Sequence, residues 1–263
     1  MKGENEAMMS EKEYRQAEGV NKSTLWNLRR SPAHYKYFLE NPPEDTAAFK
    51  FGRAVHAAIL TPTAYKRDFA ILPAGIDRRT KAGKEEYQAF IDSVAGKEII
   101  TADDAETIRG IVKAFRKNRD AVELLKGTKR ERPMFWTDDN GILCKCRVDA
   151  YKPGVMIDLK TAADAETDTF SKEAIRYGYD VQAAHYLDAY QHKESAVRPE
   201  WFFIVIEKAE PFTINILKAD IGFLDYGYMR RQELIEKLKA CRDSGSFPGY
   251  GINDLFLPGW IDY

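Results

Sequence analysis

Hydrophobic positions in the first half of the chain recur at the three- and four-residue spacing of amphipathic helices. Two short helices are expected on either side of Ser31-Pro32, the first with Ser23 as its N-cap, because a hydroxyl can accept from a free first-turn amide and proline suits a first helical turn. Longer helices are expected over residues 46–60, 84–94 and 103–125. The hydrophobic pattern of the first half of the chain therefore predicts a helical lobe.

From residue 131 the pattern changes to the alternation that is typical of half-buried strands. An Asn-Gly turn, Asp138-Asp139-Asn140-Gly141, predicts a hairpin because it tolerates positive φ. The almost wholly apolar run over residues 201–207 predicts a central strand that is buried on both faces. The remaining expected elements are strands over 131–137, 142–150, 155–160 and 212–217 and helices over 169–177, 179–193 and 221–242. Together they predict an α/β fold with a mixed central sheet flanked by helices.

The expected domain organisation is a flexible N-terminus over residues 1–20 and one domain over residues 21–263. Within that domain the helical lobe covers about residues 21–126, the sheet-and-helix core about 127–245, and a tail 246–263. Phe256 and Trp260 are the expected anchors of the tail.

Composition is ordinary for a globular protein, with 44% hydrophobic and 31% charged residues among 263. No apolar run approaches about 18 residues and the N-terminus is polar and acidic, so neither a membrane span nor a secretory signal is expected, and the cytoplasm is the expected location. The net charge of −1 gives no global basic field, although local patches could still bind nucleic acid.

The three cysteines, Cys144, Cys146 and Cys241, cannot form a disulfide framework. A zinc or iron–sulfur site would need a fourth ligand and a different spacing. We expect all three to be structural.

Two aspartates and a lysine are expected at neighbouring strand ends. Asp149 closes one strand, and in Asp158-Leu159-Lys160 alternation places Asp158 and Lys160 on one face while Leu159 points into the core. Mg²⁺ prefers a few protein oxygens, so both carboxylates and the Leu159 backbone carbonyl could hold it, and Lys160 could orient or deprotonate an attacking water. The competing interpretation is a surface strand pair with incidental charges.

His56 and the basic loop over residues 74–84 each have two interpretations. A lone histidine beside an apolar helical stripe is usually structural, and the alternative is a metal ligand. The loop is either simply solvated or a mobile contact with a polyanion.

A linked series of motifs runs along the chain: Gly52-x-x-x-His56, Glu131, Asp149, Asp158-Leu159-Lys160 and Gln182-x-x-x-Tyr186. The series resembles the RecB-like branch of the PD-(D/E)XK nuclease superfamily, over roughly residues 22–245. Within that branch, the segments 31–35, 51–60, 158–162 and 179–186 resemble the RecE-type exonuclease (exonuclease VIII) group.

The resemblance implies roles for individual residues. Asp149 and Asp158 would be the metal carboxylates, Lys160 the catalytic lysine and His56 a further metal ligand. Gln182 and Tyr186 would position the lysine, the water or the scissile phosphate. Glu131 would be a metal ligand, a carboxylate behind the ligands, or only a strand-edge charge. Basic residues expected to contact DNA are Arg53, Arg78, Arg79, Lys81 and Arg147.

The resemblance also implies an activity and partners. Such enzymes are Mg²⁺-dependent, with Mn²⁺ expected to substitute, and degrade one strand of linear double-stranded DNA from its 5′ end. The 3′ overhang is used by a single-strand-annealing recombinase. They are typically ring-shaped homo-oligomers, often tetramers, and a phage or prophage origin would fit the group.

Other functions stay open beside this one. An endonuclease or a single-strand-specific nuclease could use the same site, and a catalytically inactive DNA-binding or scaffold protein could use the same fold. A sugar- or nucleotide-modifying enzyme is disfavoured because no glycine-rich phosphate loop follows a strand.

Overall fold

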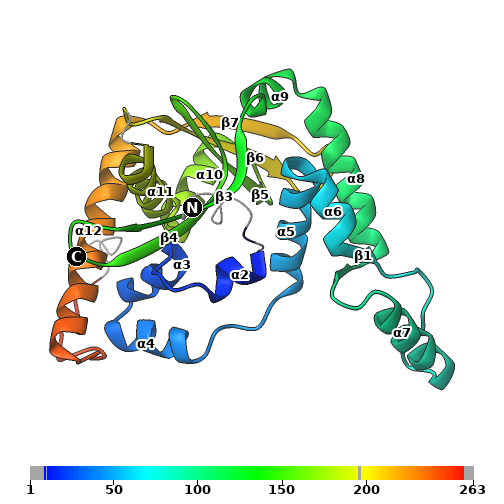
Figure 1. Ribbon diagram of the computed structural model, residues 1–263, viewed down its shortest axis with the longest axis horizontal. Helices are drawn as coiled ribbons and strands as arrows, with labels where there is room; N and C mark the ends of the chain where they lie inside the picture. The colour runs from blue at the N-terminus through cyan, green and yellow to red at the C-terminus, as the bar shows by residue number, and fades with distance from the viewer. Residues whose placement is uncertain (1–8, 10, 195–196, 258–263) are drawn as a thin grey trace.

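The computed structural model describes residues 9, 11–194 and 197–257, and a five-stranded sheet with helices on both faces lies at its centre (Figure 1). The order across the sheet is β3-β4-β5-β6-β7. β5 and β6 are parallel, and the other neighbours are antiparallel. The expected α/β class with a mixed central sheet is confirmed.

The strands follow the predicted alternation closely. Their bounds are β3 Lys129–Thr137, β4 Leu143–Lys152, β5 Val155–Ala162, β6 Glu200–Glu207 and β7 Ile214–Lys218. The turn between β3 and β4 forms as expected, with Gly141 at φ 76° and its N–H donating to the Asp138 carbonyl at 2.9 Å. A separate parallel pair is formed by β1 Phe69–Ile71 and β2 Glu98–Ile100.

The helices cover the sheet and extend the molecule on one side. Those before β3 are α2 Glu11–Gln16, α3 Lys22–Leu25, the 3₁₀ turn η1 Trp26–Arg29, α4 Pro32–Glu40, α5 Ala47–Leu60, α6 Pro62–Asp68, α7 Lys81–Ser93, α8 Ala102–Lys117 and α9 Arg119–Leu125. Those after β5 are α10 Thr167–Tyr177, α11 Tyr179–Glu194 and α12 Ile221–Ser244. Among the described residues, no helix combines the length and apolar character that crossing a bilayer requires.

Two hydrophobic cores lie on opposite faces of the sheet. Trp201, Phe203 and Val205 of β6 join the core formed with α10, α11 and α12. Ile204 and Ile206, which alternate with them, join the core formed with α5, α8 and α9. β6 is therefore buried on both faces, as its unbroken apolar run predicts.

β4 separates from β5 along most of its length. The two strands pair only at Ala150, Tyr151 and Lys152 of β4. Nearer the start of β4, Val20 occupies the open edge, where its N–H donates to the Leu143 carbonyl at 2.9 Å and its carbonyl accepts from the Lys145 N–H at 2.9 Å. Residues 143–149 of β4 therefore have no ladder partner in β5.

The segment before Val20 packs on the same strand. Of the expected flexible N-terminus, residues 1–8 and 10 lie outside the described residues, whereas Glu11–Gln16 forms α2. The Lys145 ammonium is buried and donates to the carbonyls of Tyr14 at 3.0 Å and Ala17 at 2.5 Å. A cation at the end of a helix satisfies its last carbonyls and its dipole, so Lys145 fixes α2 against β4.

Two details of the predicted helices are wrong. The single helix expected over 103–125 is broken at Asn118, whose extended backbone ends α8 and whose side chain caps α9 by accepting from the Ala121 N–H at 3.0 Å. The N-cap of α3 is Asn21 rather than Ser23, because the Asn21 side chain accepts from the Thr24 N–H at 2.9 Å.

The tail is anchored by a different aromatic residue from those expected. Phe256 is 79% exposed, so its predicted role is wrong, and Trp260 lies outside the described residues. Phe247 instead stacks on Tyr35 with ring centroids 6.2 Å apart. The three cysteines are free and buried, as expected of structural cysteines.

A buried arginine joins the last two helices to the β3–β4 hairpin. Arg231 of α12 donates to the Asp188 carboxylate at 2.7 Å and to His185 Nδ1 at 3.2 Å. Trp136 Nε1 donates to the same Asp188 oxygen at 2.7 Å, and Asp138 lies 3.7 Å from the guanidinium. Burial and the arginine charge lower the pKa of His185 to about 3, so this histidine is a neutral acceptor.

Gly227 is expected to be required for the crossing of α11 and α12. A Cβ at this position would lie 2.2 Å from the Asp180 carbonyl oxygen, which is backbone and cannot move aside. Gly227→Ala should therefore lower the free energy of unfolding by about 1–3 kcal/mol. A thermal melt would detect this as a fall of roughly 2–4 °C per kcal/mol.

Gly222→Ala on the same helix is the matched control. A Cβ there would lie 3.6 Å from its nearest neighbour, the Asp220 carboxylate, which is an ordinary contact. Alanine is also the better helix former, so this variant should melt at or above the wild-type temperature. Equal melting temperatures for the two variants would contradict the close-crossing argument.

Candidate metal and catalytic site

Asp149 lies where β4 and β5 separate. Its Oδ2 accepts from the Leu159 N–H at 2.8 Å, which satisfies a backbone amide in the region where the strands no longer pair. His56 of α5 approaches the same oxygen, with Nδ1 at 3.4 Å. One carboxylate therefore connects β4, β5 and the helix that covers them.

Glu131 completes a cluster that could hold a cation. One ligand atom from each of His56, Glu131 and Asp149 lies within 4.8 Å of the others. The β3–β4 ladder is interrupted at Glu131 and Asp149, between the pairs Arg130–Ala150 and Arg132–Val148. Glu131 has a left-handed backbone there, with φ 51°, which is uncommon for a residue other than glycine. An imidazole nitrogen with two carboxylate oxygens is a donor set that fits a divalent cation.

Asp158 and Lys160 form the second half of the site. Asp158 Oδ2 pairs with the Lys160 ammonium, and Asp158 Oδ1 accepts from Gln182 Nε2 at 2.5 Å. Lys160 also donates to Gln182 Oε1 at 3.2 Å and lies over the Tyr179 ring, 4.5 Å from its centroid. As alternation predicts, Asp158 and Lys160 share a face, while the Leu159 side chain is fully buried in the opposite core.

The charges of these residues shift one another's pKa values. Burial opposes the charge on Asp149, but the neighbouring His56 and Lys160 charges outweigh it and lower the pKa. Burial raises the pKa of Asp158 to about 6, although Lys160 opposes the shift. Burial disfavours the protonated form of His56, but the Asp149 carboxylate outweighs this effect and raises the pKa of His56 to about 9. Burial, with Asp149, raises the pKa of Glu131 to about 7. Such divergent pKa values in one cluster are typical of functional sites.

Gln182 of α11 contacts both Asp158 and Lys160, and Tyr186 follows one turn later on the same helix. Gln182 bridges Asp158 and Lys160 and so fixes both side chains. Tyr186 packs edge-on against Trp201, with centroids 5.9 Å apart. Burial, together with nearby charges that include Asp158 and Asp149, raises the pKa of its phenol.

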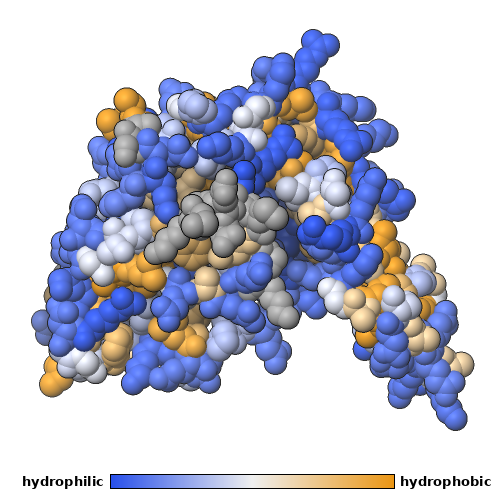
Figure 2. Space-filling model, viewed as in Figure 1, coloured by the Kyte–Doolittle hydropathy of each residue, from blue (hydrophilic) through white to orange (hydrophobic). Residues whose placement is uncertain are grey.

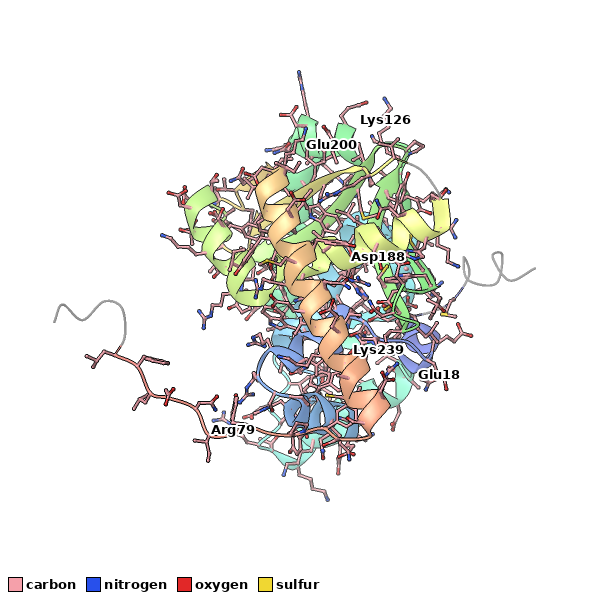
Figure 3. The ribbon with its side chains drawn as sticks, turned by 90° about the vertical axis from the view of Figure 1, so that its left-hand side faces the viewer. Glu18, Arg79, Lys126, Asp188, Glu200 and Lys239 are labelled. Atoms are coloured by element: carbon pink, nitrogen blue, oxygen red, sulfur yellow. The ribbon has the colours of Figure 1, made fainter. Side chains whose placement is uncertain are left out.

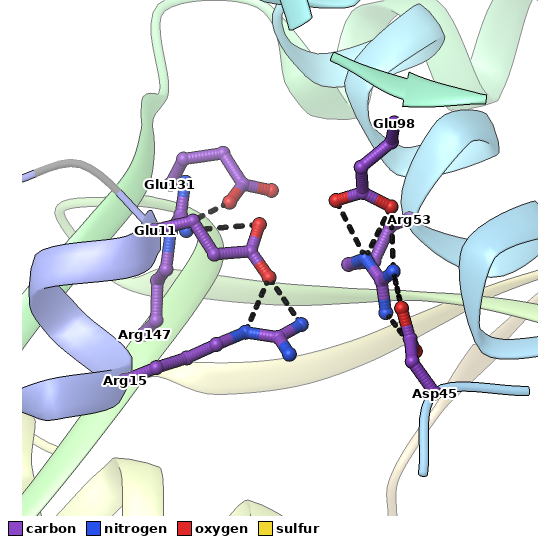
Figure 4. Close-up of polar contacts among 7 residues, drawn as sticks. All are labelled: Glu11, Arg15, Asp45, Arg53, Glu98, Glu131 and Arg147. Carbon is purple, nitrogen blue, oxygen red and sulfur yellow. Dashed lines mark hydrogen bonds and ion pairs between the residues drawn. The ribbon is translucent and has the colours of Figure 1, made fainter. Parts of the chain in front are cut away.

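Two arginines expected to contact DNA are bound to carboxylates near the site (Figure 4). Arg147 pairs with Glu131 at 2.8 Å and with Glu11 of α2 at 3.4 Å. Arg53 is held by Asp45 on one side and by Glu98 on the other. Both arginines therefore have structural partners, and a DNA contact by either stays a prediction.

The other three expected DNA contacts lie on a projecting arm. The arm consists of α7 and the loop before it, and it extends from the lower right of the molecule (Figure 1). Arg78 stacks on Tyr87 at 4.2 Å, Arg79 pairs with Asp77 at 2.9 Å, and Lys81 lies 3.9 Å from Glu85. The structure does not bring this arm to the aspartates.

A cation–aromatic cluster beside Lys160 was not predicted. Lys22 lies 5.4 Å from the Trp26 ring and 5.6 Å from the Tyr179 ring, the ring that Lys160 also covers. Arg29 and Arg230 each lie 4.6 Å from the Trp26 ring. Burial, with the nearby Lys160 charge, lowers the pKa of Lys22 to about 7. The spacing of residues 22, 26 and 29 on one helical face was the available sequence signal.

Comparisons with known proteins agree with this architecture. Residues 21–255 match a family described as a PDDEXK-like domain of unknown function (DUF3799). The crystal structure of a candidate exonuclease from Eubacterium rectale is similar with a TM-score of 0.63 and 14% identity, over 97% of this chain and 96% of that chain. A phage related exonuclease from Haemophilus somnus 129PT gives a TM-score of 0.32 and 13% identity, over 72% of this chain and 96% of that chain. A search of curated proteins found no match. The likeness to the Eubacterium rectale protein shows the fold.

Metal binding at this cluster should release protons. A cation held by His56 and Glu131 must displace the protons that their pKa values of about 9 and about 7 retain at pH 7. About one proton from His56 and about half a proton from Glu131 should leave for each Mn²⁺ bound at pH 7. Because protons compete with the metal, affinity should rise as the pH increases from 6 to 9.

Calorimetric titration with Mn²⁺ in buffers of different ionisation enthalpy measures the proton count. His56→Asn should lower the number of protons released per Mn²⁺ by about one. It should also make the Mn²⁺ affinity rise less steeply as the pH approaches 9. His192→Asn, which alters a histidine outside the cluster, is the control and should match wild type. An unchanged proton count in His56→Asn would place the metal elsewhere.

Proposed function

This chain belongs to the family of PDDEXK-like domains designated DUF3799, within the PD-(D/E)XK nuclease superfamily, and on that premise we propose that it is a divalent-metal-dependent exonuclease acting on linear double-stranded DNA. One observation carries the proposal. The Asp149 carboxylate forms a cluster with His56 and Glu131, and it also accepts a hydrogen bond from the N–H of Leu159, the residue between the ion-paired Asp158 and Lys160.

His56, Glu131 and Asp149, with Asp158 and the Leu159 carbonyl as further donors, would hold the metal. A bound divalent cation supplies Lewis-acid stabilisation of a phosphodiester and a more acidic water. Mg²⁺ is the proposed physiological ion and Mn²⁺ a substitute, and the imidazole donor suits the softer Mn²⁺ at least as well.

Lys160 supplies a fixed positive charge beside the reacting phosphate. Burial opposes this charge, but the Asp158 carboxylate raises the pKa of Lys160, so the ammonium is retained. Gln182 holds the lysine and the aspartate in one geometry, which limits reorganisation during the reaction. Lys160 is thus suited to orient an attacking water or a phosphate oxygen.

The cation–aromatic cluster beside Lys160 supports a nucleic-acid substrate. Arg29 and Arg230 supply positive charge, to which Lys22 adds when it is protonated, and Trp26 and Tyr179 supply rings. Cations combined with stacking rings are typical of surfaces that bind single strands, and an exonuclease must handle a strand as it leaves the duplex. The cluster is thus a local group of cations on a chain whose net charge is −1.

The finer features of the proposal come from the motif resemblance. They are RecE-type 5′ to 3′ degradation, a 3′ overhang passed to a single-strand-annealing recombinase, a ring-shaped homo-oligomer, a cytoplasmic location and a phage or prophage origin. The name of the Eubacterium rectale protein accords with an exonuclease.

Asp158→Asn should abolish metal-dependent nucleotide release from linear duplex DNA. Loss of the carboxylate removes a metal donor and frees Lys160, so we expect a fall on the order of 10³-fold, corresponding to about 4 kcal/mol of transition-state stabilisation. Binding to duplex DNA in Ca²⁺ should change little. Asp139→Asn, in the exposed hairpin turn, is the control and should retain activity.

The form of the DNA substrate that is degraded distinguishes an exonuclease from the alternative functions. Linear duplex labelled at the 5′ or the 3′ end should lose the 5′ label first, as mononucleotides, while a covalently closed circle stays intact. Cleavage of the circle would identify an endonuclease, and preference for unpaired DNA a single-strand-specific enzyme. Wild-type-like release by Asp158→Asn would refute the site assignment, and DNA binding without release by the wild type would indicate a binding protein.

A further inference from the structure

A groove lies on the outer side of the helical layer, away from the aspartates. Its volume is about 470 Å³, and its floor is formed by apolar side chains of α5, α6 and α8 that include Ala58, Pro62, Ile108 and Val112. A smaller hollow of about 140 Å³ continues it toward α9. Figure 2 shows hydrophobic atoms exposed along the right-hand side of the molecule, where α8 lies, with hydrophilic side chains bordering them.

The rim of the groove is positively charged. Lys66, Lys113, Arg116 and Lys117 line it, and none of the four has a carboxylate partner within the part of the chain that the structure describes. Arg109, also at the rim, is neutralised by Glu106. An apolar floor with an unpaired cationic rim is complementary to a peptide that is both apolar and acidic.

The chain carries such a peptide in its own tail. After α12, the tail is tied to α4 by Phe247 on Tyr35 and by Tyr250, whose ring lies 5.6 Å from His34. Residues 251–257 are exposed and have no regular secondary structure, and Figure 3 shows the end of the tail extending away from the body of the molecule.

The side chains of this free segment are unusually apolar for their exposure. Ile252, Leu255 and Phe256 are 107%, 99% and 79% exposed, whereas such residues are normally buried. Their i, i+3, i+4 spacing is that of an amphipathic helical turn bound in a groove. Residues 243–263 contain no lysine or arginine, and Asp254 stands between the apolar positions.

We propose that the segment around Ile252–Leu257 of one protein molecule docks into the α5–α8 groove of a second copy. The tail departs beside α4, at the lower left of Figure 1, and the groove lies along α8 at the right, so the two surfaces are on different sides of one molecule. An interface between two different surfaces of the same protein is heterologous, and its repetition from copy to copy produces a closed ring or a filament. DNA is a poorer occupant because its backbone presents charged phosphates, which the cationic rim could contact but the apolar floor could not.

Two double variants test the two halves of the joint. Leu255→Asp with Phe256→Asp removes the apolar anchors, and Lys113→Glu with Arg116→Glu reverses the rim charge. All four side chains are exposed, so both proteins should fold, which a thermal melt verifies. Light scattering coupled to gel filtration should give a multiple of the protomer mass for wild type and a single protomer for each variant.

Mixing the two variants is the sharper experiment. The tail variant carries Leu255→Asp with Phe256→Asp, and the rim variant carries Lys113→Glu with Arg116→Glu. Neither variant can associate with itself, but the intact tail of one rim-variant molecule can bind in the intact groove of one tail-variant molecule. An equimolar mixture should therefore form a two-protomer assembly and nothing larger. Lys172→Glu with Arg176→Glu, an exposed charge reversal on α10, is the matched control and should keep the wild-type mass.

The remaining outcomes overturn the proposal. A monomeric wild type, or variants that keep the wild-type mass, would exclude the joint. An unchanged mass with at least tenfold weaker binding of the rim variant to duplex DNA would identify the groove as a nucleic-acid surface. Mass is read without reference to catalysis, so neither result bears on the nuclease activity.

Discussion

The hydrogen bond from the Leu159 N–H to the Asp149 carboxylate is the contact on which the site depends. Adjacent antiparallel strands normally satisfy each other's amides, but β4 and β5 do so only over three residues of β4. Where they separate, a carboxylate substitutes for a backbone carbonyl as the acceptor. The same group that accepts in place of the missing ladder bond is thereby held, half-buried and charged, at the place where chemistry would occur.

Acidic and basic side chains are grouped separately around that carboxylate. The acidic cluster of Glu131 and Asp149 faces His56, and Asp158 is neutralised by Lys160 and fixed by Gln182. Lys22, one of the cations around Trp26, also contacts the Tyr179 ring that Lys160 covers. An acidic group and a basic group of side chains thus adjoin in the candidate site, although the whole chain is nearly neutral.

Sequence reasoning located the parts of the site that local rules determine. Alternation placed Asp158 and Lys160 on one face, and the family resemblance, rather than local spacing, suggested that Gln182 lies near them. It could not predict the left-handed backbone of Glu131 or the docking of α2 through Lys145, because both depend on contacts distant in sequence. It also assigned Phe256 as an anchor from its apolar character alone, whereas exposure depends on whether a partner surface is present.

The docking of residues 11–20 has a practical consequence for handling the protein. The family match begins at residue 21, so trimming to that boundary would discard Val20 and α2. The Lys145 ammonium would then lose its carbonyl acceptors, and the edge of β4 would be left unpaired. Open strand edges promote aggregation, so poor solubility of a shortened chain would reflect the missing segment rather than an unstable core.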